Sequence, residues 1–257
     1  MRSTIKMIIG VGLLSLITMS PTMAQEESST RMFENILITP DNEDLKTLGE
    51  NLRKHNQTYH APGTAHAASV FNIANGPNAG KLIWSMGPIT FAHLDSRPAE
   101  GGHDEDWRDN VMPYVESIDT AEYWSTMADY SNLESLDGDI SKTPLLYIRY
   151  YNVAKDRGHQ IDHLFSQMSA AVKAMDGDNP FGFYDNEFRQ GFAIGRHIAT
   201  VSFMKNWAEL DDDWGFKAAF EKANGEGKWQ AYIDGMNDAF SDSWDEIWSY
   251  NKELSGH

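Results

Sequence analysis

Cysteine is absent from the 257-residue sequence. The chain therefore forms no disulfide, even though an exported protein could, and it cannot carry a lipid-modified N-terminal cysteine. Its stability must then come from the packing of a core. Eight tryptophans, ten tyrosines and twelve phenylalanines provide large apolar surfaces for that core.

Basic residues are scarce. The sequence has 21 lysines and arginines against 38 aspartates and glutamates, for a formal net charge of −17 at pH 7. A surface this acidic repels phosphate backbones and anionic lipid headgroups. We therefore expect no nucleic-acid partner, and a well-solvated exported protein is the simplest explanation of the charge.

Long apolar runs are also missing, apart from one short stretch near the N-terminus. Residues 7–18 are mostly apolar, Arg2 and Lys6 precede them, and a short segment that ends at Ala24 follows. This order is typical of a secretory signal, and the run is shorter than the roughly 20 residues that span a bilayer. We expect a signal peptide at residues 1–24 and a periplasmic or secreted mature chain, with an uncleaved anchor as the alternative. After signal removal no membrane contact is expected.

Two short motifs each occur twice. Asp-Glu-Asp-Trp at 104–107 recurs as Asp-Asp-Asp-Trp at 211–214, and Glu-Tyr-Trp-Ser at 122–125 recurs as Glu-Ile-Trp-Ser at 246–249. Carboxylates are favoured at helix starts, where free backbone N–H groups and the positive end of the dipole attract them. We interpret both acidic motifs as helix starts. Together with the order of elements, the motifs predict an internal duplication.

The pattern of the first copy predicts the order β-α-β-β-α-β. Leu45, Leu48, Leu52 and Tyr59 fall within one stripe at the 3.6-residue period of a helix. Residues 75–80 have the composition of a hairpin loop between two strands. The predicted elements are a strand at 32–38, the helix just named, strands at 68–74 and 81–91, a helix near 107–118 that Pro113 can kink, and a strand at 123–127.

The second copy repeats this order. The stripe of its first helix consists of Ile161, Leu164, Phe165, Met168 and Val172. The other predicted elements are strands at 145–153, 181–188 and 198–204, a long helical stretch that begins at 211, breaks at Gly225 and Gly227 and resumes over 229–240, and a closing strand at 247–250.

A β-α-β-β-α-β unit is the ferredoxin-like split arrangement, in which helices cover one face of the sheet and the other face is bare. Two such units can bury their bare faces against each other. The chain therefore resembles the dimeric α/β-barrel superfamily in a single-chain tandem form. The resemblance implies an α+β fold with a first ferredoxin-like half at 25–131, a linker at 132–144 and a second half at 145–257, packed sheet to sheet as a pseudo-dimeric barrel.

The resemblance implies several activities rather than one. The superfamily includes cofactor-independent monooxygenases, haem-degrading enzymes, dye-decolorising peroxidases and chlorite dismutases, and the fold does not choose among them. Its halves commonly hold a ligand between the first helix and the sheet. In that place His55 would be a general base or an axial haem ligand, and Tyr59, His60 and Trp84 would line the cavity. The alternative is a core-edge histidine that is satisfied by a backbone carbonyl.

Three further histidines have simpler explanations. His159 and His163 have the i, i+4 spacing of a metal pair, but at about 100° per residue they lie roughly 160–200° from the apolar stripe and should face water. His103, with the acidic motif after it, looks like a site for a hard metal. The second copy keeps the acids and replaces this histidine with Leu210. We therefore attribute the acids to helix capping and expect no metal site.

The second half offers one more candidate site. Tyr147, Arg149 and Tyr151 share one face of a strand, because strand side chains alternate with a period of two. There Arg149 and Tyr151 would bind a ligand, with the guanidinium holding a carboxylate or polarising an oxygen. The alternative is a structural ion pair between Arg149 and one of the many acids.

Three functions follow from these patterns. The first is an exported barrel protein that binds a small aromatic or oxidisable molecule and, as an enzyme, oxidises it without a cofactor, using His55 as the base. The second is a haem protein of the chlorite-dismutase or peroxidase kind, for which no matching proximal-histidine motif is found. The third is a non-catalytic binding or scaffold module whose barrel is filled by aromatic side chains. A cavity near His55 or Arg149 would argue against the third.

Overall fold

The computed structural model describes residues 31–97, 101–188, 190 and 196–256. The expected signal peptide at 1–24 lies outside these residues. Within them, no helix is both long and apolar enough to cross a bilayer.

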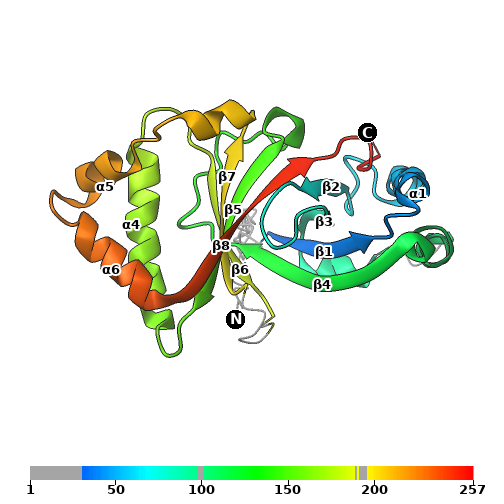
Figure 1. Ribbon diagram of the computed structural model, residues 1–257, viewed down its shortest axis with the longest axis horizontal. Coiled ribbons are helices and arrows are strands. Elements are labelled where there is room, and N and C mark those ends of the chain that lie inside the picture. The colour runs from blue at the N-terminus through cyan, green and yellow to red at the C-terminus, as the bar shows by residue number, and fades with distance from the viewer. Residues whose placement is uncertain (1–30, 98–100, 189, 191–195, 257) are drawn as a thin grey trace, which may run out of the picture.

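Eight strands form a closed antiparallel barrel (Figure 1). Its order is β1-β3-β2-β8-β5-β7-β6-β4, so β4, β1, β3 and β2 form one continuous arc and β8, β5, β7 and β6 form the other. The arcs join through β2 with β8 and β4 with β6. The strands are β1 Met32–Pro40, β2 Ala68–Ile73, β3 Leu82–Ile89, β4 Val115–Thr126, β5 Leu145–Val153, β6 Phe181–Asn186, β7 Ile198–Met204 and β8 Phe240–Tyr250.

The α-helices pack outside the barrel. In Figure 1, α4, α5 and α6 lie together on one side, and α1 lies on the opposite side. Leu48 and Leu52 of α1 are buried against the outer face of the first arc, and Phe165 of α4 and Phe220 of α5 are buried in the cluster on the outer face of the second arc. The described α-helices are α1 Leu45–Tyr59, α2 Phe91–Asp95, α3 His103–Asp106, α4 Ile161–Ala174, α5 Phe216–Asn224 and α6 Trp229–Ala239.

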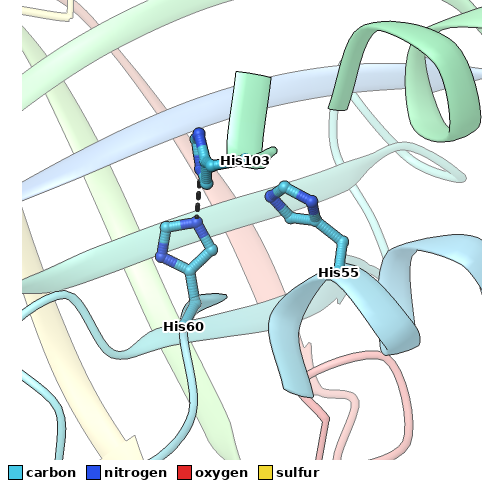
Figure 2. Close-up of side chains that lie close together, drawn as sticks. All are labelled: His55, His60 and His103. Carbon is cyan, nitrogen blue, oxygen red and sulfur yellow. Dashed lines mark hydrogen bonds between the residues drawn. The ribbon is translucent and has the colours of Figure 1, made fainter. Parts of the chain in front are cut away.

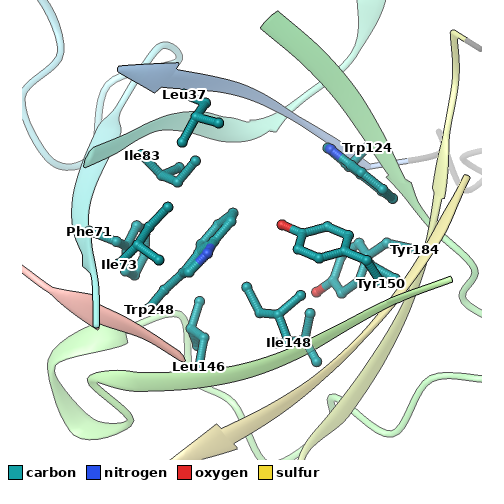
Figure 3. Close-up of a cluster of buried hydrophobic side chains, with 12 residues drawn as sticks. Leu37, Phe71, Ile73, Ile83, Trp124, Leu146, Ile148, Tyr150, Tyr184 and Trp248 are labelled. Atoms are coloured by element: carbon teal, nitrogen blue, oxygen red, sulfur yellow. The ribbon is translucent and has the colours of Figure 1, made fainter. Parts of the chain in front are cut away.

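Alternation along the strands sorts side chains between the barrel lumen and the helices. On β5, Ile148 and Tyr150 belong to the lumen cluster, whereas Tyr151 belongs to the cluster beneath α4, α5 and α6. Figure 3 shows side chains from both arcs, among them Trp124 and Trp248, directed into the lumen. The predicted burial of two sheet faces against each other therefore takes the form of one closed barrel with a common interior.

The repeated Glu-x-Trp motif has the same structure in both places. Nε1 of Trp124 donates to Oε2 of Glu122 at 2.9 Å, and Nε1 of Trp248 donates to Oε2 of Glu246 at 3.0 Å. Both glutamates are buried, at 1% and 0% exposure. Each indole therefore satisfies a carboxylate inside the barrel, which explains why these residue types recur together.

The helix expected near 107–118 is wrong in its second part. Helical structure covers α3, a π-helical turn at Trp107–Val111 and a 3₁₀ turn at Met112–Tyr114, and β4 starts at Val115. The closing strand is therefore much longer than the expected 123–127. Pro113 cannot continue a helix, and β4 pairs with β1 over nearly its whole length, so ladder hydrogen bonds replace helical ones.

The first acidic motif lies in the first turn of α3, as predicted, but the second is not a helix start. Residues 207–211 form a 3₁₀ turn, and α5 begins only at Phe216. Gly215 adopts a left-handed conformation with φ of 63°, and its N–H donates to Asp213 Oδ1. This turn separates the motif from α5. The closing strand again starts early, at Phe240 rather than 247, because β8 pairs with β5 throughout.

Candidate metal centre

The end of α1 and the short helix α3 bring three histidines together. His55 extends the buried stripe of Leu48 and Leu52, so its imidazole lies beneath the helix. His60 follows the last turn of α1, and its carbonyl accepts a hydrogen bond from the backbone of β2. His103 is the first residue of α3. All three are buried, with exposures of 1%, 1% and 8% in that order.

The ε-nitrogens of the three rings face one another. Nε2 of His60 lies 3.0 Å from Nε2 of His103 (Figure 2). One potential ligand atom from each histidine lies within 4.8 Å of the other two. Among the described residues, no fourth histidine or carboxylate belongs to this group.

Each δ-nitrogen is held by an acceptor at the outside of the cluster. Nδ1 of His55 lies 2.8 Å from Asp106 Oδ2, Nδ1 of His103 lies 2.7 Å from Asp104 Oδ1, and Nδ1 of His60 lies 2.8 Å from the carbonyl oxygen of His66. Such contacts fix the tautomer and the orientation of an imidazole in metal sites. The acids of the first motif lie in the first turn of α3, as predicted, but α3 has no side-chain capping hydrogen bond, and two of these acids hold histidine rings instead.

These partners determine where the protons lie. Carboxylate and carbonyl oxygens only accept, so each Nδ1 carries the hydrogen, and a neutral ring then has a bare lone pair on Nε2. Two such lone pairs meet across the 3.0 Å between His60 and His103. Nε2 of His55 is buried without any hydrogen-bond partner. A cation placed between the three Nε2 atoms would satisfy all of these lone pairs.

Burial keeps two of the rings neutral. Desolvation, together with the neighbouring His55 and His103, lowers the pKa of His60 to about 3. Desolvation also lowers the pKa of His55, although the hydrogen bond that His55 donates to Asp106 opposes this. Burial alone would raise the pKa of Asp106, but its hydrogen bonds with His55 and Asn110 outweigh that effect and hold the pKa below its usual value. Neutral imidazoles beside an ionised carboxylate are the forms that bind a metal.

Aromatic rings enclose the cluster. Tyr59 and Trp107 lie 5.0 and 5.1 Å from the His55 ring between centroids, and Trp84 lies 4.9 Å from the His60 ring. Trp84 Nε1 donates to Asn56 Oδ1 at 2.9 Å. Trp84 therefore packs against the histidines, where the resemblance implied that it lined a ligand cavity.

The donor set suits a borderline transition metal. Zn²⁺ takes imidazole nitrogens at about 2.0–2.1 Å, and two ligands at tetrahedral to octahedral angles are then roughly 2.9–3.4 Å apart. The 3.0 Å between His60 and His103 lies in this interval. Structural zinc sites are closed by four protein ligands, whereas catalytic sites use three and keep one position open. Three imidazoles match the second kind.

The remaining predicted residues lie elsewhere. Tyr151 is buried under α4, α5 and α6, and Arg149 forms a two-point ion pair with Asp245, at 2.6 and 2.8 Å. The ion-pair alternative for Arg149 is thus what the structure has. His159 and His163 are exposed, as their helical positions predict.

Sequence reasoning brought His55, Tyr59, His60 and Trp84 into one group, and the structure places all four together. It missed His103 as a member of that group. The available signal was that the similar acidic motif at 211–214 follows a leucine, Leu210, so such a motif does not need a histidine before it.

A large cavity lies in the lumen and beside the second arc. It has a volume of about 2010 Å³, and its lining includes Arg149 and Tyr151 together with lumen residues such as Tyr150. No histidine is among the described lining residues, and the chain has no cysteine. A histidine- or thiolate-ligated haem therefore does not fit this cavity. The three-histidine cluster is packed by aromatic rings, so it does not suit a macrocycle either.

No family model and no curated protein matches the chain. Solved structures do, at low identity. A candidate monooxygenase from Fusobacterium nucleatum subsp. nucleatum is 6% identical, with a TM-score of 0.56 over 88% of this chain and 94% of that chain. A mutant chlorite dismutase from Candidatus Nitrospira defluvii is 5% identical, with a TM-score of 0.54 over 88% and 94%. Another mutant of that dismutase, in complex with cyanide, is 6% identical, with a TM-score of 0.53 over 89% and 95%. The chain therefore has the mixed α+β fold of the dimeric α/β-barrel proteins.

Proposed function

We propose that the protein binds a divalent transition-metal ion on His55, His60 and His103 and presents it to a small molecule. The observation that carries the proposal is the convergence of three Nε2 atoms whose Nδ1 atoms are all held by acceptors. A metal in such a site supplies Lewis acidity at its open position.

The energetics favour a metal over a simple histidine cluster. A buried polar atom without a partner costs about 1–3 kcal/mol, and here Nε2 of His55 is one. The facing lone pairs of His60 and His103 add repulsion. A single metal ion relieves both, whereas a proton between His60 and His103 leaves His55 unsatisfied.

The ligand types narrow the choice of metal. Imidazole suits Zn²⁺, Cu²⁺, Ni²⁺, Co²⁺ and iron, whereas Ca²⁺ and Mg²⁺ prefer oxygen ligands. We therefore propose a zinc-like site. This departs from our expectation, from sequence, of a protein without a metal.

Two further features of the protein belong to this proposal. The order of charged, apolar and small residues at 1–24 supports export to the periplasm or beyond. The two four-stranded arcs, each with its own Glu-x-Trp pair, support an origin as two fused ferredoxin-like halves.

Cobalt is the test. Co²⁺ titrated into metal-free protein should give visible d–d absorption of a nitrogen-ligated ion with one equivalent bound, and Zn²⁺ should displace it. His103→Ala should abolish tight binding. His163→Ala, which removes an exposed histidine, is the matched control and should bind normally. Equal binding by both variants would disprove the site.

A second candidate function rests on the His55–Asp106 pair. A buried imidazole oriented by a carboxylate, with its other nitrogen free, has the geometry of a general base. Cofactor-free oxidation of a small substrate would then persist in chelator-treated protein and be lost in His55→Ala. Loss of activity on chelation alone would favour the metal instead.

A further inference from the structure

The inner wall of the first arc carries a row of polar side chains. Asn35 of β1 lies opposite Ser85 of β3, and Ser85 lies opposite Ser69 of β2. Cross-strand partners at one level point to the same face of a sheet. All three line the large cavity.

The second arc has no such row at the matching level. The buried glutamates of the two Glu-x-Trp motifs define equivalent levels in the two arcs. Glu122 pairs with Asn35 in the first arc, and Glu246 pairs with Ile148 in the second. From Ile148 the row continues to Val201 and then Gly182. The positions of Asn35, Ser85 and Ser69 are thus taken by an isoleucine, a valine and a glycine. The barrel therefore does not need polar residues here in order to fold.

The polar row has hydrogen-bonding capacity to spare. Asn35 is only 9% exposed, and its Oδ1 has no hydrogen-bond partner. The hydroxyl groups of Ser69 and Ser85 make no hydrogen bond to any described residue. An unsatisfied buried amide oxygen is unfavourable, so a group that does not belong to the protein is the natural partner.

Across the lumen the second arc presents aromatic rings. Tyr150, Tyr184 and Trp248 belong to the lumen cluster (Figure 3) and line the same cavity. Glu122 adjoins the row, but Arg196 neutralises it through bonds of 2.8 Å to Oε1 and 2.9 Å to Oε2. A molecule in the lumen therefore meets rings on one side and neutral donors and acceptors on the other.

We infer that the barrel lumen is a binding site for a neutral aromatic molecule with a polar group on one edge, such as a phenol. The ring packs on the aromatic wall, and the polar edge bonds to Asn35, Ser85 and Ser69. This site lies inside the barrel, whereas the three histidines lie between α1 and the outer face of the first arc. It does not depend on the metal.

The test uses 4-fluorophenol and fluorobenzene, followed by ¹⁹F NMR on the full chain. Because one neutral hydrogen bond changes an equilibrium roughly 2- to 12-fold, 4-fluorophenol should bind about 10-fold more tightly than fluorobenzene. Asn35→Leu, and the double variant Ser69→Ala with Ser85→Ala, should erase this preference while fluorobenzene still binds.

Tyr151→Phe is the matched control, because Tyr151 lines the cavity on the other side of the barrel wall. It should leave the preference intact. The inference is overturned if wild type binds both probes equally, or if Tyr151→Phe alone removes the preference. Should Asn35→Leu not fold, the serine double variant decides by the same criterion. His103→Ala should bind both probes as wild type does, which separates this result from that of the metal test.

Discussion

Removal of the Asp106 carboxylate should weaken metal binding without removing a metal ligand. Asp106 Oδ2 accepts from Nδ1 of His55 at 2.8 Å, and this bond holds the ring in the tautomer whose Nε2 is bare. The same bond opposes the desolvation that lowers the pKa of His55. In Asp106→Ala the ring of His55 can rotate and change tautomer, and its Nε2 becomes a weaker metal ligand.

The expected size of the effect follows from the role of the bond. Loss of an outer partner of a metal-bound histidine typically weakens metal affinity about 10- to 100-fold. At a free metal concentration of 100 times the wild-type Kd, binding stabilises the wild type by about 2.7 kcal/mol. A 30-fold weaker variant would gain only about 0.9 kcal/mol at that concentration. For a chain of this length, this corresponds to a Tm increase that is about 4–7 °C smaller than in wild type.

Competition with a chromophoric chelator gives the Kd, and thermal unfolding with and without Zn²⁺ gives the Tm increase. Asp106→Asn keeps an oxygen acceptor but not the charge, so it should fall between wild type and Asp106→Ala. Asp109→Ala, which removes an exposed acid three residues away, should behave as wild type. An unchanged Kd in Asp106→Ala would refute the role of this carboxylate in holding His55.

Three other perturbations test the packing and charge of the barrel. Arg196→Met leaves Glu122 buried without its cation and should reduce the free energy of unfolding, measured in urea, by about 3–5 kcal/mol. The double variant Arg196→Met with Glu122→Gln should lose less, and equal losses would contradict this role of the ion pair. Burial alone would raise the pKa of Asp245, but hydrogen bonds from Arg149 and Tyr147 of β5 hold this pKa below its usual value. The stability advantage of wild type over Asp245→Asn should therefore be full above about pH 5 and shrink as the pH falls through the lowered pKa, and a difference independent of pH would count against it. Phe165→Ala removes a fully buried ring and should reduce the free energy of unfolding by about 3–5 kcal/mol. Leu45→Ala, at a half-exposed position, should reduce it by less than about 1 kcal/mol. Similar losses in the two variants would mean that Phe165 is not a core residue.

Local periodicity was enough to predict the helices that rest on a sheet. Leu48 and Leu52 recur at helical spacing, and the expected bounds of the helix agree with α1. The stripe around Leu164 and Phe165 likewise agrees with α4. In both cases the apolar face is continuous in sequence, so a local pattern carries the information.

The two closing strands were predicted too short for a physical reason. Glu116 and Asp119 of β4 are exposed, so its first half lacks the apolar alternation that predicts a strand. That half is extended because β1 offers it a partner, from Pro40 opposite Val115 onward. Such pairing joins residues about 75 positions apart, and no local pattern records it.

The sequence by itself determined the character of this protein: an acidic, cysteine-free chain with enough aromatic surface for a core and a β-α-β-β-α-β order that predicts a ferredoxin-like barrel. Only the tertiary structure decided where His103 lies, because 43 residues separate it from His60 and the two rings meet only when α3 packs beside α1. It also decided that Asn35, Ser69 and Ser85 share one level of the lumen, because a shift of one residue in strand register would turn each of them to the outer face. Residue types and their periods are local properties of a chain, whereas a binding site depends on the distances that packing sets between distant segments.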